Sequence, residues 1–138
     1  MPTQSQEAVV SSTTTRIPRI GTVIVPVADV DRQIEFYVGT LGFEKRVDVP
    51  FGGDYRWVEV APEGAETTIA IAPPPPGGSA GNVQTGIALQ SADVDSLHAE
   101  LRDKGVDVDD EVSRMGEPVP PMFWFRDPEG NTLIVVKA

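Results

Sequence analysis

The sequence predicts an α+β domain built from two tandem βαβββ modules. Three observations support this: a short motif occurs twice, helix-like and strand-like apolar periods follow each occurrence in the same order, and glycine-containing turns fall at matching places. The chain has 138 residues, 40% of them apolar, which is enough for one ordinary core. Two independent domains of about 60 residues would each bury too little surface, so the modules should share a core.

The repeat consists of three pairs of short segments in the same order. The sequence Ala-Asp-Val-Asp occurs at 28–31 and again at 92–95, Leu-Gly-Phe at 41–43 corresponds to Lys-Gly-Val at 104–106, and Ala-Pro-Glu-Gly at 61–64 corresponds to Asp-Pro-Glu-Gly at 127–130. The spacing between the partners is 64, 63 and 66 residues, respectively. Three ordered matches at nearly constant spacing indicate an internal duplication.

Each repeated motif marks the start of a helix. Asp29 and Asp93 follow apolar strand-like runs and can accept hydrogen bonds from the free N–H groups of the first helical turn. Apolar residues then recur at helical spacing, at Val30, Ile34, Tyr37, Val38 and Leu41 in the first copy and at Val94, Leu97, His98 and Leu101 in the second. Gly42 and Gly105 are expected to end the helices in the left-handed conformation.

Strands are expected at matching places in both copies. The predicted ranges are 19–27, 43–48, 54–61 and 66–72 in the first copy, and 85–91, 106–109, 119–126 and 131–137 in the second. The domain is expected to span 18–138, with modules at 18–73 and 84–138, after a disordered polar tail at 1–17. The proline- and glycine-rich stretch 73–83 suits a linker, and a proline-rich binding motif is the functional alternative for it.

Composition excludes several classes of function. The chain has no cysteine, which excludes disulfides, thiolate metal sites and cysteine nucleophiles. No apolar run reaches the roughly 18 residues of a membrane span, and the N-terminus lacks the features of a secretory signal, so a cytoplasmic location is the default expectation. The net charge of −10 disfavours nucleic acids and anionic membranes as partners. It serves either solubility alone or the attraction of a cationic small molecule.

Three stretches resemble one known family. The segment VPVADVDRQIEFYVGTLGFE, the second ADVD and the closing FRDPEGNTLIVV are similar to the vicinal oxygen chelate superfamily, which includes glyoxalase I, extradiol dioxygenases, epimerases and bleomycin-resistance proteins. The similarity covers about residues 18–138. It implies that the paired modules curl into an open, cup-shaped mixed sheet. In the family's enzymes, His, Glu or Gln side chains from the first and last strand of each module hold a divalent metal in the cup.

The resemblance places the four metal-ligand positions at residues of other types. These positions hold Thr22 and Gly86 on the first strands, and Thr68 (or Ala70) and Ile134 on the last strands. None of them is a usual ligand. The single histidine, His98, lies on a predicted helix in register with its apolar face, where a packed histidine is the ordinary finding. No metal and no other cofactor is therefore expected.

The residues expected to face the cup are small, apolar or neutral, with aromatic side chains on the third strand of each module. The candidate ligand-binding residues are Tyr55, Trp57, Glu59, Phe123, Trp124 and Phe125. The aromatic side chains either pack the core or a dimer interface, or they line a dry cleft for a flat or apolar ligand. Glu59 alternates with Trp57 and is either a solvated surface residue, a counter-ion for a cation, or a general base. Repeat counting pairs Trp57 with Phe123.

Two hypotheses about function follow. The first is a metal-free protein resembling the bleomycin-resistance branch, which sequesters an antibiotic or metabolite that is aromatic or cationic. The second is a glyoxalase- or dioxygenase-like enzyme, a lyase, isomerase or oxygenase, with unusual site residues. A homodimer is expected because each module supplies only half a cup. The sequence leaves open whether modules pair within one chain or between chains.

Overall fold

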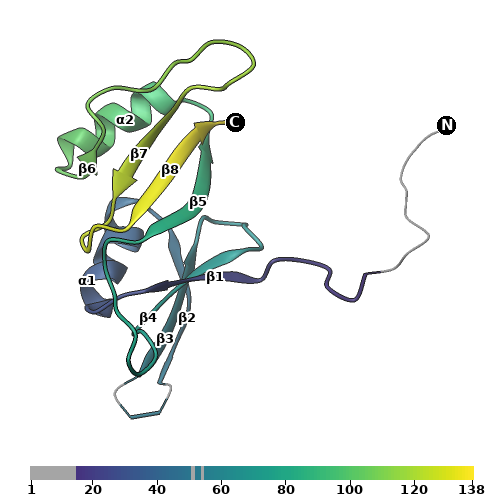
Figure 1. The fold of residues 1–138 in the computed structure, drawn as a ribbon, viewed down its shortest axis with the longest axis vertical. Helices are drawn as coiled ribbons and strands as arrows, with labels where there is room; N and C mark the ends of the chain where they lie inside the picture. The colour runs from purple at the N-terminus through teal and green to yellow at the C-terminus, as the bar shows by residue number, and fades with distance from the viewer. Residues whose placement is uncertain (1–14, 51, 54) are drawn as a thin grey trace.

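The strands form two four-stranded mixed sheets with the same order. The computed structural model describes residues 15–50, 52, 53 and 55–138, and most of the expected tail at 1–17 lies outside them. The first sheet has the order β1 (Thr22–Pro26), β4 (Thr68–Ala72), β3 (Arg56–Ala61), β2 (Glu44–Pro50), and the second β5 (Gln84–Ser91), β8 (Thr132–Lys137), β7 (Met122–Arg126), β6 (Asp107–Val108) (Figure 1). In each sheet the first two strands are parallel and the others antiparallel. The predicted fold class is confirmed.

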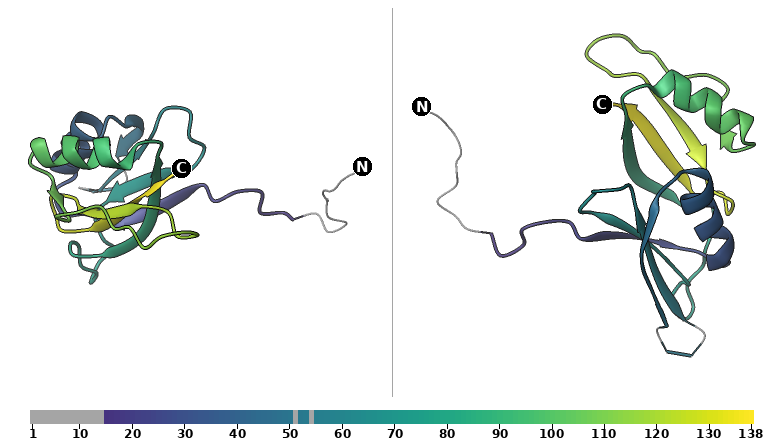
Figure 2. Two further views of the ribbon diagram at one scale, coloured as in Figure 1. Left: turned by 90° about the horizontal axis from the view of Figure 1, so that it is seen from above. Right: turned by 180° about the vertical axis from the view of Figure 1, so that it is seen from behind.

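The helices lie on one side of the sheets (Figure 2). The first helical segment consists of α1 (Val30–Ile34) and a π-helical continuation, η2 (Glu35–Thr40), and the second is α2 (Val94–Asp103). Alternate residues of each strand point to this side and are buried. One hydrophobic cluster contains the inward residues of both modules: Val25, Val27, Phe36, Tyr37, Val58, Val60, Ile69, Ile71, Val94, Leu101, Phe123, Phe125, Leu133 and Val135. The cluster thus includes buried residues from both modules.

Both helices begin and end as the sequence predicts. Asp29 accepts a hydrogen bond from the N–H group of Arg32 at 3.1 Å, and Asp93 accepts one from Ser96 at 3.0 Å. Gly42 and Gly105, which follow the helices, have φ values of 82° and 83°, in the left-handed region that glycine tolerates best. Within the described residues, no helix combines the length and apolarity needed to cross a membrane.

Several elements are shorter than expected, and two of the differences have a clear physical reason. The first helix widens into the π-helical form after Ile34, and this brings the consecutive side chains of Phe36 and Tyr37 into the core. Strand β7 begins at Met122 rather than at residue 119, since prolines at 118, 120 and 121 lack the N–H group that a strand ladder uses.

Candidate functional site

The face of the first sheet opposite the helices is largely apolar and open. Because Val58 and Val60 of β3 point into the core, Trp57 and Glu59 point to the other face. Pairing between strands places Ala70 of β4 beside Glu59 and beside Ile24 of β1. The side chain of Ile24 is 57% exposed, although it lies in the middle of a strand. This open face therefore presents apolar surface to the exterior of the single chain.

A pocket of about 360 Å³ lies at one end of this face. Its lining is almost entirely apolar and consists of Ile24, Tyr55, Trp57, Ala72, Pro73, Pro75 and Pro76. The hydroxyl group of Tyr55 donates a hydrogen bond to the carbonyl oxygen of Pro74 at 3.0 Å, which holds the proline run against the sheet. The stretch expected to be a linker thus forms one wall of the pocket.

One carboxylate is fixed on this open face. The indole N–H group of Trp57 donates to Oε2 of Glu59 at 2.7 Å, and the hydroxyl group of Thr68 donates to Oε1 at 2.8 Å. Thr68 itself is buried, and Glu59 is half-buried. Because both donors are neutral, Glu59 keeps its negative charge uncompensated by these contacts. Each oxygen retains acceptor capacity for a further donor.

The second sheet has an equivalent open face. Trp124 of β7 pairs with Ile134 of β8, which in turn pairs with Ala88 of β5. Ala88 and Gln90 are exposed, whereas Trp124 and Ile134 are half-buried. The two open faces together carry the apolar and aromatic surface that the sequence predicted for a cup.

The structure places Phe123 and Phe125 in the core rather than on an open face. Both are fully buried. The ring of Phe123 meets the edge of His98 with ring centres 5.0 Å apart, and Phe125 lies 6.2 Å from Phe36. We therefore remove both phenylalanines from the candidate ligand-binding residues and keep Trp124.

The pairing of Trp57 with Phe123 is corrected for the same reason. Ile24 and Ala88 hold matching places before the repeated motif, and their neighbours on the last strands are Ala70 and Ile134. Glu59 pairs with Ala70 and Trp124 pairs with Ile134, so Glu59 and Trp124 are counterparts. The connection from β3 to β4 is one residue longer than that from β7 to β8, and a shift of one residue moves a side chain to the other face.

The four expected metal-ligand positions do not fit a metal. Thr22 lies opposite Thr68, and its hydroxyl group donates to the Thr68 carbonyl oxygen at 3.2 Å. Ala70, and not Thr68, is the counterpart of Ile134. Gly86 lies where the register of β5 with β8 shifts, and its φ of 71° would strain any residue with a side chain. In the described ranges, no three His, Asp or Glu side chains cluster closely enough to hold a metal.

His98 has a structural environment. It is 8% exposed, its Nε2 atom lies 2.6 Å from the carbonyl oxygen of Asp109, and its ring packs on Phe123. This agrees with a packed histidine on the helix side of the sheet, away from the open faces.

Two groups with strongly shifted pKa values also lie on the helix side. Burial, together with the nearby carboxylate of Asp127, raises the pKa of Tyr37 well above its ordinary value. Hydrogen bonds from Arg56 and then Lys45 hold the pKa of Asp48 well below its ordinary value. Arg56 also pairs with Asp31 of α1, so these charges tie the helix to the sheet.

Comparison with known proteins adds independent information. Residues 19–135 match the profile of the Glyoxalase/Bleomycin resistance protein/Dioxygenase superfamily. The uncharacterized protein YetH of Bacillus subtilis (strain 168) is 31% identical over 124 residues, covering 86% of this chain and 98% of YetH. The solved structure of TnmS3, an antibiotic binding protein from Streptomyces sp. CB03234, is 32% identical with a TM-score of 0.78, covering 90% of this chain and 98% of that one. A superfamily member from Sphaerobacter thermophilus DSM 20745 is 31% identical with a TM-score of 0.82, covering 90% and 100%.

Proposed function

Because the chain belongs to the Glyoxalase/Bleomycin resistance protein/Dioxygenase superfamily, we propose that it is a binding protein for a flat, mainly apolar small molecule, which lies on the open face of the first sheet. The observation that carries this proposal is the apolar pocket beside Trp57, with one oriented carboxylate next to it. Pockets that combine apolar walls with a few fixed polar groups are typical of small-molecule sites.

The pocket selects for a flat, apolar ligand body. Its volume of about 360 Å³ is at the lower end of the range for ligand sites. The indole ring of Trp57 offers a flat surface in this pocket, and stacking on an aromatic ring contributes roughly 0.5–1.5 kcal/mol beyond area burial. A planar ring system therefore gains more from this site than a flexible or polar molecule of equal size.

Glu59 adds a preference for a ligand that carries a cation or hydrogen-bond donors. Its carboxylate is already oriented by Trp57 and Thr68, so a ligand meets a fixed acceptor and need not order it. A charge-assisted hydrogen bond to such a group is roughly twice as strong as a neutral one. The acidic net charge of −10 would also attract cationic ligands at low salt.

We expect the site to be completed by a second copy of the chain. Part of each open face is exposed in the single chain: Ile24 is 57% exposed on the first, and Ala88 and Gln90 are exposed on the second. In a two-fold dimer the first sheet of one subunit would face the second sheet of its partner, so that the Trp57 face and the Trp124 face become opposite walls of one cleft. The homodimer itself is part of the proposal.

Binding is favoured over metal-assisted catalysis by the chemistry of the residues present. Thr22, Ala70, Gly86 and Ile134 offer no imidazole or carboxylate at the positions where the family's enzymes hold their metal. The similarity to TnmS3, which is described as an antibiotic binding protein, supports an antibiotic as the class of ligand.

The test is a thermal-shift screen of the purified protein against flat aromatic antibiotics, both neutral and cationic. A ligand that binds the folded state raises the unfolding midpoint. Trp57→Ala should weaken the best ligand by about tenfold, whereas Trp57→Phe, which keeps a ring, should weaken it less. Glu59→Gln should weaken only cationic ligands, and more at low salt than at high salt. A ligand whose affinity is unchanged in Trp57→Ala would exclude this face as the site.

A further inference from the structure

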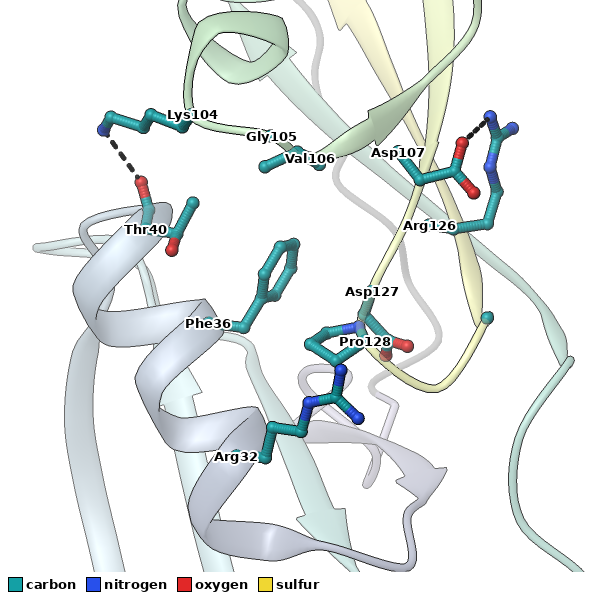
Figure 3. Close-up of a pocket in the computed structure, with 11 residues that line it drawn as sticks. Arg32, Phe36, Thr40, Lys104, Gly105, Val106, Asp107, Arg126, Asp127 and Pro128 are labelled. Atoms are coloured by element: carbon teal, nitrogen blue, oxygen red, sulfur yellow. Dashed lines mark hydrogen bonds and ion pairs between the residues drawn. The ribbon is translucent and has the colours of Figure 1, made fainter.

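A groove of about 440 Å³ lies on the helix-covered side, where the two modules meet. One wall is the first helical segment, with Arg32, Phe36 and Thr40. The other is formed by residues 104–107, which follow α2, and by the turn at 126–130 (Figure 3). None of the open-face residues lines this groove, so it is a separate place on the molecule.

The carboxylates that line the groove are already bonded. Asp107 pairs with Arg126 at 2.9 Å, and hydrogen bonding to Arg126 lowers the pKa of Asp107. Asp127 is 4% exposed and accepts hydrogen bonds from the N–H groups of Glu129 and Asn131, at 2.9 and 3.0 Å. These negative charges therefore have partners and do not define the groove as a cation site.

The guanidinium group of Arg32 is the free charge in the groove. It makes no hydrogen bond or ion pair with any residue that the structure describes, and it extends toward Pro128 (Figure 3). Lys104 lies at the other end, where its ammonium group bonds to the Thr40 carbonyl oxygen at 3.2 Å and to Glu100 at 3.1 Å. An adjoining hollow shares Arg32, Phe36, Thr40 and Pro128 with the groove and is also lined by Glu35, so an anion is favoured at the part of the groove away from Glu35.

Apolar surface lies between these two cationic ends. The ring of Phe36 projects into the middle of the groove, with Val106 above it and Pro128 beside Arg32 (Figure 3). Phe36 is only 8% exposed, so its position is fixed by the core behind it. The floor of the groove is therefore rigid and apolar, next to a free guanidinium group.

From this arrangement we infer a second binding site for a small organic anion: its carboxylate or phosphate group pairs with Arg32, and its apolar ring lies on Phe36, Val106 and Pro128. Arginine binds such groups through two parallel N–H donors, which suits a free guanidinium group at the edge of an apolar floor. The site stands independently of the ligand on the open faces, since the two share no residue.

The probe for this site is phenyl phosphate, titrated into ¹⁵N-labelled protein and followed by NMR. We expect saturable shifts of the amide signals of Gly105, Val106 and Gly130, which line the groove. Inorganic phosphate lacks the ring and benzyl alcohol lacks the charge, so each should bind more weakly than phenyl phosphate. Arg32→Gln should weaken the binding of phenyl phosphate by about tenfold or more, since it removes the charged donor that pairs with the phosphate group. Arg32 is exposed and unpaired, so this variant should fold normally, as its thermal midpoint will show.

The matched control is Arg19→Gln, which removes an exposed arginine outside the groove. It should bind phenyl phosphate like the unmodified protein. Three results would overturn the inference: no saturable shift in the groove, equal affinity for inorganic and phenyl phosphate, or equal weakening by Arg32→Gln and Arg19→Gln. The last result would show that only the overall charge matters.

Discussion

The turn after β7 and the turn after β3 carry the same Pro-Glu-Gly sequence, but they contribute differently to the contact between the modules. The carboxylate of Glu129 accepts hydrogen bonds from the backbone N–H groups of Ala28 and Asp29, each at 2.8 Å, and so joins the second module to the start of the first helix. Its counterpart Glu63 is exposed and bonds to no described residue. Near the turn that contains Glu63, Pro62 and Leu97 line a mainly apolar cavity of about 250 Å³.

The first helix and α2 differ at matching places too. Gln33 is fully buried, and neither polar atom of its side chain has a hydrogen-bond partner among the described residues. The matching residue of α2 is Leu97, which packs against the core. Matching residues of the two modules therefore do not have the same role. Glu129 bonds to the first helix whereas Glu63 does not, and only the first helix contains a buried amide without partners, which lowers stability.

The largest effect on stability is expected at the contact between the rings of Phe125 and Phe36, which belong to different modules. Phe125→Ala removes a fully buried ring that meets Phe36, so it should lower the free energy of unfolding by about 3–5 kcal/mol. Trp124→Ala, the neighbouring residue on the open face, should cost less because Trp124 is already partly exposed. Urea denaturation of both variants measures the difference. Equal losses of unfolding free energy would contradict the assignment of Phe125 to the core and Trp124 to the open face.

The next effect compares the two turns directly. Glu129→Gln keeps one acceptor oxygen but loses the second acceptor and the charge, so it should lower the free energy of unfolding by about 0.5–2 kcal/mol, the range for the loss of a helix-capping side chain. Glu63→Gln, at the matching place, should leave stability unchanged within the error of the same denaturation experiment. If both substitutions change the free energy of unfolding equally, the contact of Glu129 with the first helix does not stabilise the protein.

A smaller effect, of opposite sign, is expected at Gln33. Gln33→Leu copies the residue of the second module and should raise the free energy of unfolding by about 1 kcal/mol, since it removes a buried amide without partners. The reciprocal variant Leu97→Gln should destabilise the protein. A loss of stability in Gln33→Leu would show that the amide has a partner in solution, such as a bound water.

The smallest effect concerns alkaline pH. The pKa of Tyr37 is raised above its ordinary value of 10.0 by burial and by Asp127, so the folded protein holds this proton where the unfolded chain releases it. The contribution of Tyr37 to stability should therefore be constant below about pH 10 and decrease as the pH rises above it. Tyr37→Phe should remove that part of the slope while changing neutral-pH stability little. Denaturation at several pH values measures both slopes, and identical slopes would contradict the assignment.

Local features were predictable from the sequence, but the faces of the aromatic residues were not. The helix caps at Asp29 and Asp93 and the succession of strands and helices along the chain depend on residues close together in the sequence, so their pattern is sufficient. The side to which Trp57 and Phe123 point depends on strand register, and one extra residue between β3 and β4 reversed the expected correspondence. The contact of Glu129 with Ala28 joins residues 101 positions apart, which a single sequence does not reveal.

The candidate site was predicted in part for the same reason. The strand-like pattern placed Tyr55, Trp57 and Glu59 on one strand, whereas β3 begins at Arg56, just after Tyr55. Alternation correctly put Glu59 on the face of Trp57. The bond between them, the support from Thr68 and the proline wall needed the folded chain. The groove beside Arg32 combines segments about 70 to 100 residues apart, and its only signal in the sequence was an arginine on a helix.

The central claim, that the Trp57 face binds the ligand, is tested most directly by tryptophan fluorescence. The chain has two tryptophans, so Trp124→Phe leaves Trp57 as the single emitter. Titration of this variant with the strongest ligand from the thermal-shift screen should change its emission saturably, with the same midpoint as the affinity that thermal shift gives for the same variant. A ligand that still stabilises the variant but leaves the Trp57 emission unchanged would contradict the account and place the binding site elsewhere.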